Sequence, residues 1–233
     1  MTADRFRALW DFEDVDGSER RLRAQLDRER TPAGRAEALT QLARVESLRG
    51  DFDACERLLL EAEQLVGPDD TARIRIDLER GRKLRSSGDG PAAVPLFEAA
   101  FALACERREF FLAGDAAHMV ALADPSLMDE WTERGLDLAE GEPEAAYWAG
   151  PLLNNLAWSR FDAGEHERAL ELFERALAAH ERDPADEAGI AWGRYGVAAA
   201  LRSLGRGGEA DSVMRPALEW ASRAGKPEDY FEG

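Results

Sequence analysis

Small and large apolar residues recur along the chain at helical spacing. In three stretches a small residue is followed four positions later by a large one and three positions after that by another small one, and each stretch opens with Gly and an acidic residue. These triplets are Cys55, Leu59 and Ala62; Ala93, Phe97 and Ala100; and Ala169, Phe173 and Ala176. After "GRGG" a fourth triplet follows, Ala210, Met214 and Ala217. Because such spacings place side chains on one face of a helix, the pattern predicts four helices with equivalent buried faces.

A second apolar helix precedes each of these helices. Its clearest copies are Leu39, Leu42, Ala43 and Leu153, Leu156, Ala157, and its weaker copies are Gly81 with Leu84 and Val197, Ala198 with Leu201. Each unit is therefore predicted to be a helix, a short turn containing Gly, and a second helix. Small residues stand where two helices approach closely, and large ones fill the space to the next pair.

The spacing of the units indicates a repeat. Ala93 follows Cys55 by 38 residues, Ala169 follows Ala93 by 76, which is two such periods, and Ala210 follows Ala169 by 41. The missing middle unit is the degenerate stretch 110–140, whose second helix is expected to begin with Asp124 as N-cap and Pro125 in the first helical position. Its register is open by one residue.

The predicted organisation has three parts. Residues 1–32 form an N-terminal segment, in which a helix over residues 18–30 with Ser18 as N-cap closes the end of the stack. Residues 33–224 form five units, and residues 225–233 form a tail with exposed Tyr230 and Phe231. The expected units are 33–68, 69–108, 109–141, 142–183 and 184–224. Trp10 and Phe12 either pack on the first helices as a lid or belong to a detachable segment that occupies a groove.

This pattern resembles the tetratricopeptide repeat, and the stretch from Leu153 through Ala169 to Ala176 is its best copy. The resemblance covers residues 33–224 and implies an all-α, right-handed solenoid of about five repeats. The period is longer than the usual ~34 residues. The whole chain also resembles a group of bacterial tetratricopeptide proteins, through "LWDFED" near its start and "DAAHM" in the third unit. That second resemblance implies no activity.

In tetratricopeptide repeats the first helix of each pair lines the concave side, at the second, fifth, sixth, ninth and twelfth positions of the unit. The resemblance therefore assigns a groove with arginines in its N-terminal half, aromatic residues in its C-terminal half, and polar residues between. The candidate groove residues are Arg44, Arg75, Arg82, Arg85, Asp115, His118, Asn154, Asn155, Trp158, Phe161, Trp192, Tyr195 and Arg202.

These residue types suit a peptide with acidic and apolar character. Guanidinium groups bind carboxylates, amides donate to and accept from a peptide backbone, and aromatic slots take apolar side chains. In peptide-binding members of the family, an Asn at the sixth position often holds the ligand's backbone or terminal carboxylate, and Asn155 matches that position. The lysines of the family's carboxylate clamp are missing, so the analogy is loose.

Each candidate also has a purely structural interpretation. The arginines can pair with Glu37 and Glu79 of adjacent units, and Asn155 can form a hydrogen bond between helices. His118 can pair with Asp115 one turn earlier.

The aromatic slots have a structural interpretation of their own. Trp158 and Trp192 can be filled by the solenoid itself or by the C-terminal tail.

Composition narrows the class of partner. The chain has 47 Asp and Glu against 30 Lys and Arg, a net charge of −17. This disfavours nucleic acid and anionic membrane surfaces, both of which attract basic proteins. No apolar run approaches the ~20 residues of a membrane span, and the start has no signal-peptide pattern. Cys55 and Cys105 fit reduced core residues, and we expect a cytoplasmic protein.

Catalytic and metal-binding patterns are absent from the sequence. "HERAL" at His166 begins like a zinc-protease motif, but Leu170 stands where the second His is required. His166 and His180 are about 21 Å apart on one helix. We therefore expect no enzyme activity, no metal and no cofactor.

The prediction is a binding module, an adaptor or scaffold for a protein or peptide segment. The alternatives are a scaffold that self-associates through a solenoid end, and the sensor domain of a peptide-responsive bacterial regulatory system.

Overall fold

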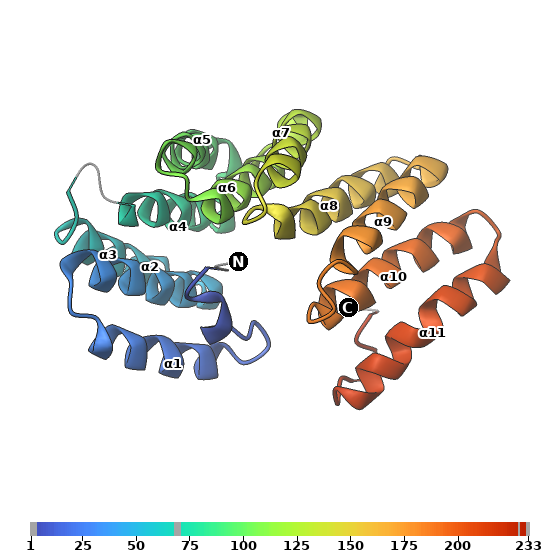
Figure 1. Cartoon of the computed structure of the whole chain (residues 1–233), viewed down its shortest axis with the longest axis horizontal. Helices are drawn as coiled ribbons and strands as arrows, with labels where there is room; N and C mark the ends of the chain where they lie inside the picture. The colour runs from blue at the N-terminus through green and yellow to red at the C-terminus, as the bar shows by residue number, and fades with distance from the viewer. Residues whose placement is uncertain (1–3, 68–70, 228, 232–233) are drawn as a thin grey trace. The chain divides into compact units, whose positions relative to one another are not determined.

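The computed structural model of the protein describes residues 4–67, 71–227 and 229–231, which are helical and contain no strand. Three short 3₁₀ helices, Arg7–Leu9, Pro125–Leu127 and Ala146–Trp148, accompany the α-helices. The α-helices, shown in Figure 1, are α1 (Val15–Arg28), α2 (Pro32–Arg49), α3 (Phe52–Glu63), α4 (Ala72–Ser86), α5 (Gly90–Arg107), α6 (Phe110–Ala123), α7 (Met128–Gly141), α8 (Ala149–Asp162), α9 (His166–His180), α10 (Glu187–Ser203) and α11 (Gly207–Arg223).

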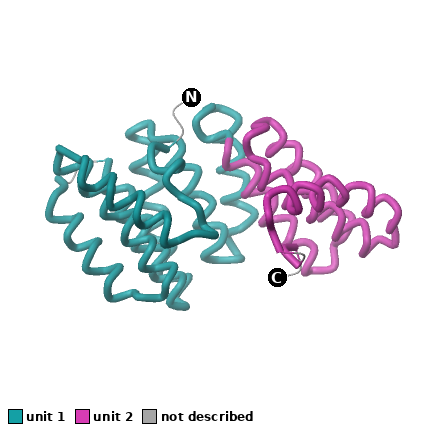
Figure 2. The backbone as a smooth tube through the Cα atoms, turned by 90° about the horizontal axis from the view of Figure 1, so that it is seen from below, with its two compact units in different colours: residues 1–146 teal, residues 147–233 magenta. Residues whose placement is uncertain are grey.

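The chain divides into two compact units, residues 1–146 and residues 147–233, drawn in teal and magenta in Figure 2. In unit 1, α1 packs on α2, α2 on α3 and α4, and each later helix on its neighbour through to α7. In unit 2, α8 packs on α9 and α10, and α10 packs on α9 and α11. The repeat boundary expected between residues 68 and 69 lies outside the described residues, and the three later boundaries fall in connections between helices.

The Gly-acid pairs of the sequence form the turns inside the helix pairs. Gly50 and Gly88 have φ angles of 78° and 96°, the left-handed conformation that ends a helix at low cost only for Gly. The acid that follows begins the next helix: the Asp51 side chain accepts a hydrogen bond from the backbone N–H of Ala54, at 2.8 Å. The same two-residue signal therefore stops one helix and starts its partner.

Glycines inside the first helices of two pairs permit close packing against a phenylalanine. A Cβ on Gly81 would lie 2.5 Å from the Phe97 ring, and a Cβ on Gly196 would lie 2.4 Å from the Phe173 ring. Both rings are fully buried. The first contact lies within one helix pair, α4 and α5, and the second joins α9 to α10 of the following pair, so small and large positions meet both inside a pair and between successive pairs.

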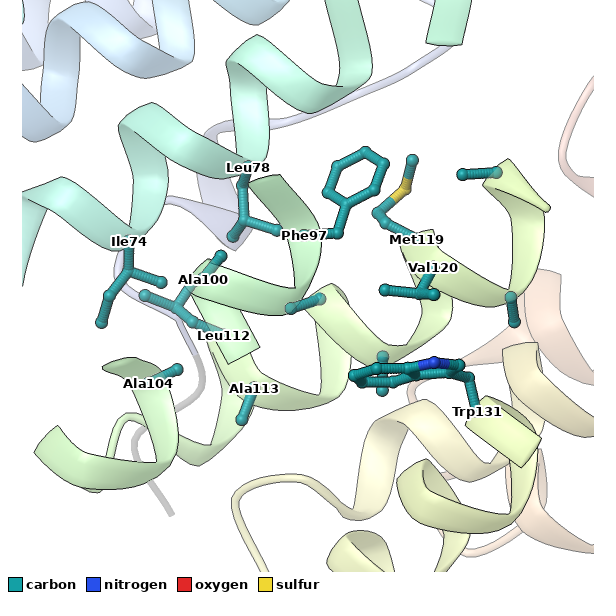
Figure 3. Packing of buried hydrophobic residues seen from close by; sticks show 14 of the residues in the cluster. Ile74, Leu78, Phe97, Ala100, Ala104, Leu112, Ala113, Met119, Val120 and Trp131 are labelled. Atoms are coloured by element: carbon teal, nitrogen blue, oxygen red, sulfur yellow. The ribbon is translucent and has the colours of Figure 1, made fainter. Parts of the chain in front are cut away.

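An apolar cluster of unit 1 lies between α4, α5, α6 and α7 (Figure 3). Phe97 and Trp131 supply its largest rings, and small residues from α5 and α6 such as Ala100 and Ala113 let the helices approach. Trp131 meets Phe101 edge to face, with ring centroids 5.1 Å apart. The degenerate third unit therefore keeps a full core although its sequence pattern is weak.

The structure corrects one of the expected helix starts completely and the other in part. Ser18 is not an N-cap: α1 begins at Val15, and Asp14 caps it by accepting from the backbone N–H of Gly17. Ser18 is buried instead, and its Oγ donates to the carbonyl oxygen of Asp11 at 2.8 Å. Asp124 does cap, since its carboxylate accepts from the backbone N–H of Ser126 at 2.9 Å, but the segment it opens is a 3₁₀ turn that precedes α7.

Candidate functional site

The predicted groove residues divide between the two units. Those on α2, α4 and α6 belong to unit 1 and include all the arginines except Arg202, together with Asp115 and His118. Those on α8 and α10 belong to unit 2 and include both asparagines and the aromatic residues.

Arg82 is held by two carboxylates within unit 1. Its guanidinium lies 2.5 Å from Glu79 Oε1 and 2.5 Å from Asp115 Oδ1, and all three side chains are buried. Burial opposes the charge on Arg82, but the two carboxylates outweigh it and raise its pKa. Burial likewise favours a neutral Asp115, and the charges of Arg82 and Arg44 outweigh it and lower its pKa. This network fixes α4 against α6 and leaves Arg82 engaged.

Arg75 is engaged as well. Its Nε lies 3.1 Å from Glu37 Oε2, and its Nη2 lies 2.5 Å from Asp4 Oδ1 in the N-terminal segment. Its guanidinium also lies 5.1 Å above the ring of Phe6, which is fully buried. The structural interpretation, pairing across adjacent repeats, therefore holds for Arg75 with Glu37. Arg82 pairs with Glu79 on its own helix, and its partner in the next repeat is Asp115.

Arg44 is covered by the N-terminal aromatic residues. Trp10 and Phe12 stack with centroids 5.1 Å apart, and the Arg44 guanidinium lies 5.5 and 5.1 Å from the two rings. The indole N–H of Trp10 donates to Gln41 Oε1 at 2.8 Å. Burial is the main reason why the pKa of Arg44 is lowered, and the charge of Arg82 adds to it. Trp10 and Phe12 thus pack on the first helices, and they do so over a predicted groove residue.

The other polar candidate residues of unit 1 also interact with neighbouring groups of the chain. Arg85 donates from Nε to the carbonyl oxygen of Leu122 at 3.2 Å. Burial lowers the pKa of His118 to about 4, with Asp115 opposing and Arg82 contributing, so the imidazole is neutral at physiological pH. The arginine-rich half of the predicted groove is therefore largely satisfied by the chain itself.

Unit 2 presents a different surface. Asn154 and Asn155 are half-buried on α8, and in the described part of the chain Asn154 makes no hydrogen bond. Trp158 follows one turn later and is also half-buried. An amide and an indole N–H beside apolar rings can bind a peptide backbone.

The aromatic residues of α8 and α10 form one continuous group. Trp158 lies 5.3 Å from Phe161, 4.8 Å from Phe173 and 5.8 Å from Tyr195, measured between ring centroids. Tyr195 in turn lies 5.6 Å from Trp192. Phe173 belongs to the core, whereas the other four rings are half-buried at the surface.

The tail residues Tyr230 and Phe231 contact this group, so the expectation that they are exposed is wrong. Phe231 is only 5% exposed, stacks on Tyr195 at 5.6 Å and meets Trp192 edge to face at 5.0 Å. The indole N–H of Trp192 donates to the Tyr230 hydroxyl at 3.3 Å. The sequence suggests that the tail can cover Trp192, but it does not single out Phe231 as the residue that does so. Two adjacent aromatic residues just beyond the last helix are the pattern that points to such a contact.

Arg202 lies apart from these residues. Its side chain is exposed, and its Nη2 lies 3.4 Å from Asp211 on α11. An exposed ion pair of this kind contributes little binding energy or stability.

The described residues contain no group of three or more His, Cys, Asp or Glu side chains arranged to hold a metal ion. One close His-Asp pair occurs, His180 Nδ1 with Asp186 Oδ2 at 2.6 Å. A Cβ at Gly150 or Gly189 would collide with the His180 ring, so this imidazole is wedged between α8 and α10. Its position explains the pair as a tie between helices. Within the described ranges, no helix is long and apolar enough to cross a membrane.

Comparisons with known proteins agree with the repeat architecture. The tetratricopeptide repeat family model matches residues 152–182, and no curated protein matches the chain. Among solved structures, BtubC (BKLC) from P. vanneervenii is similar, with a TM-score of 0.66, 16% identity, and coverage of 95% of this chain and 91% of that one. A putative kinesin light chain from Podosopora anserina, with nearly identical TPR-like repeats, has a TM-score of 0.59, 17% identity, and coverage of 85% and 100%. These matches confirm the predicted tetratricopeptide repeat at residues 152–182 and the predicted all-α solenoid fold.

Proposed function

We propose that this chain is a non-enzymatic peptide-binding module, and that the peptide binds the surface formed by Asn154, Trp158 and the aromatic residues of α10. Tetratricopeptide repeats are a fold of protein interaction modules, and this surface supplies the chemistry that such a role needs. The adaptor or scaffold role of the module is part of the same proposal.

The single observation that carries the proposal is the Asn154 amide. It is half-buried one turn before Trp158 and makes no hydrogen bond within the described residues, so both its donor and its acceptor are available to a ligand. A bound peptide backbone would satisfy both its donor and its acceptor. The half-buried rings beside it would take an apolar side chain of the same peptide, at a modest entropic cost because rings have few rotamers.

The arginines of unit 1 have a smaller part in this proposal than the sequence pattern implied. Arg75 and Arg82 already bind carboxylates of the chain, so an acidic ligand would have to break buried ion pairs to use them. Arg44 is covered by Trp10 and Phe12, so it too is occupied by the chain itself.

The proposed location is the cytoplasm, and the proposal excludes nucleic acid and membrane partners. Both cysteines are free thiols, and Cys55 is fully buried, as suits a reducing compartment. The net charge of −17 opposes binding to polyanions.

The test is selection of binders from a random nine-residue peptide library on the immobilised full chain. Peptides enriched on the wild type should bind Asn154→Ala about fivefold more weakly or worse, the loss of about one net hydrogen bond. Glu171→Ala, an exposed polar substitution on α9, is the matched control and should bind as the wild type does. If the enriched peptides bind all three proteins equally, this surface is not the binding site.

A second candidate function is self-association through α11. By position in the repeat, Leu218 corresponds to Leu177, which packs against Gly193 of the following repeat, and Leu218 is 50% exposed. Asp211 occupies the position of buried Leu170, so the outer face of α11 is only partly apolar. Sedimentation velocity decides: a monomer at all concentrations refutes this function, and an assembly abolished by Leu218→Glu supports it.

A further inference from the structure

The chain folds back on itself after its last helix. Gly225 has a φ of 68° and ends α11, and the backbone N–H of Lys226 donates to the carbonyl oxygen of Ala221. A second turn follows, in which the N–H of Tyr230 donates to the carbonyl oxygen of Pro227 at 3.1 Å. The two turns bring residues 230 and 231 onto α10.

The contacts that hold this returning segment are mainly aromatic. Phe231 stacks on Tyr195 with an interplanar angle of 19° and meets Trp192 at 72°. Tyr230 lies 5.4 Å from Trp192 and 6.0 Å from Trp220, and the Lys226 ammonium lies 5.4 Å from its ring. The Trp192 indole N–H donates to the Tyr230 hydroxyl and so also joins the segment to α10.

The residues that receive this segment, Trp192 and Tyr195, are the ones that the proposed function assigns to a peptide. From this coincidence we infer that Tyr230 and Phe231 are a built-in occupant of the binding surface, and that the external ligand is a peptide with adjacent aromatic residues that displaces them. The inference rests on the proposed function. It adds the class of ligand and a form of regulation, because the occupied surface admits only ligands able to compete.

The contacts of Tyr230 and Phe231 define the groups that a competing peptide needs. One ring must lie flat on Tyr195 and reach Trp192, as Phe231 does, because offset stacking and edge contacts are the favourable arrangements of aromatic rings. A neighbouring oxygen must accept from the Trp192 N–H, as the Tyr230 hydroxyl does. A bound peptide that extends from there toward Trp158 would reach Asn154, because Trp158 lies 5.8 Å from Tyr195.

The N-terminal segment differs from this arrangement in a way that makes it a poor occupant. Phe6 is fully buried in a cluster with Leu22, Leu42 and Val45, so displacing it would open the core of unit 1. The tail contacts half-buried residues of α10 through its rings. Its release would expose the rings of the binding surface but would not open the core of unit 2. Of the two flanking segments, only the tail is suited to exchange with a ligand.

The test uses the full chain and a labelled peptide of its own last eight residues, KPEDYFEG. In the wild type, the tethered segment competes at an effective concentration on the order of 1 mM. In the double variant Tyr230→Ser, Phe231→Ser, the surface is vacant. For a peptide with a Kd on the order of 0.1 mM, fluorescence anisotropy should give about tenfold tighter binding to the double variant than to the wild type.

Three controls make the measurement specific. The peptide KPEDSSEG should bind neither protein. Phe12→Ser, which removes an exposed aromatic residue from unit 1, should bind KPEDYFEG as the wild type does. Introducing Trp192→Phe into the double variant should weaken binding several-fold, because the ring remains but its N–H donor is lost.

The outcomes separate this inference from the proposed function. Equal affinity of wild type and double variant for KPEDYFEG would overturn the inference, as would failure of the double variant to bind it. Library peptides whose affinity depends on Asn154 would leave the proposed function standing in either case. A wild-type dimer that the double variant loses would show that the tail binds a second copy, and it would overturn the intramolecular arrangement.

Discussion

Substitution of Phe6 by Ala tests whether the N-terminal segment is part of the fold or a removable lid. Phe6 is fully buried with Leu22, Leu42 and Val45, and the guanidinium groups of Arg5 and Arg75 lie 4.5 and 5.1 Å from its ring. Removing a buried phenylalanine side chain costs about 3–5 kcal/mol, because the transfer energy is lost and a cavity remains. The cation–π contacts are lost with the ring and add up to about 1 kcal/mol each.

Phe12→Ala is the matched control for this prediction. Its ring is 58% exposed and stacks only on Trp10 and beneath Arg44. Its loss should reduce stability by about 0.5–1.5 kcal/mol. The two phenylalanines lie six residues apart in the same segment, so the difference between the variants isolates the depth of burial.

Native-state hydrogen exchange is the appropriate assay, because repeat proteins unfold in parts and one global unfolding free energy does not describe them. Phe6→Ala should lower the opening free energy of the amides of α1 and α2 by about 3 kcal/mol or more. Amides of α10 and α11 should exchange as in the wild type. If Phe6→Ala lowers protection of α1 and α2 by no more than Phe12→Ala does, the segment is detached in solution and the argument from burial fails.

Three further predictions concern packing and titration. Gly196→Ala should destabilise the protein by about 1–2 kcal/mol in urea unfolding, because its Cβ would lie 2.4 Å from the Phe173 ring, whereas Gly208→Ala, whose Cβ meets nothing within 4 Å, should be neutral or stabilising by up to about 1 kcal/mol; equal effects would contradict the close contact. Burial raises the pKa of Cys55 to about 12, so the native protein should react with a thiol reagent at pH 8 far more slowly at this residue than unfolded chain does, and equal labelling rates would refute its burial. Because the pKa of His118 falls from its ordinary 6.5 to about 4 on folding, the unfolded state binds more protons between these values, and stability should fall as the pH is lowered from about 6.5 to about 4; His118→Gln should flatten this part of the unfolding free-energy curve, and an unchanged slope would speak against it.

The repeat architecture could be predicted because its determinants are local. Helical spacing of small and large residues, together with Gly and Asp at the turns, specifies helix pairs through interactions within a few residues. Gly50 ends α2 and Asp51 starts α3, as expected from the Gly-acid pair. The prediction failed at Ser18, where two residues four positions apart could both cap a helix and Asp14 is the one that does.

The candidate site could be predicted only in part. Repeat register placed Asn154, Trp158 and Tyr195 among the candidate groove residues, and the structure brings Trp158 and Tyr195 within 5.8 Å of each other. Register could not reveal which charged residues satisfy one another. Arg82 could have faced a ligand or Asp115, which lies 33 residues away, and only their meeting across two helices distinguishes the two cases.

The sequence by itself therefore determined the helix pairs, their turns and the small and large positions at which neighbouring helices meet, because those depend on short-range geometry. Tertiary structure decided how the surface is used. It paired Arg75 and Arg82 with carboxylates of other helices and of the N-terminal segment, and it placed Tyr230 and Phe231 on Trp192 and Tyr195. These contacts join residues more than 30 positions apart, and they form because desolvated charges require counter-charges and exposed rings gain by stacking. No local pattern encodes such a choice among partners.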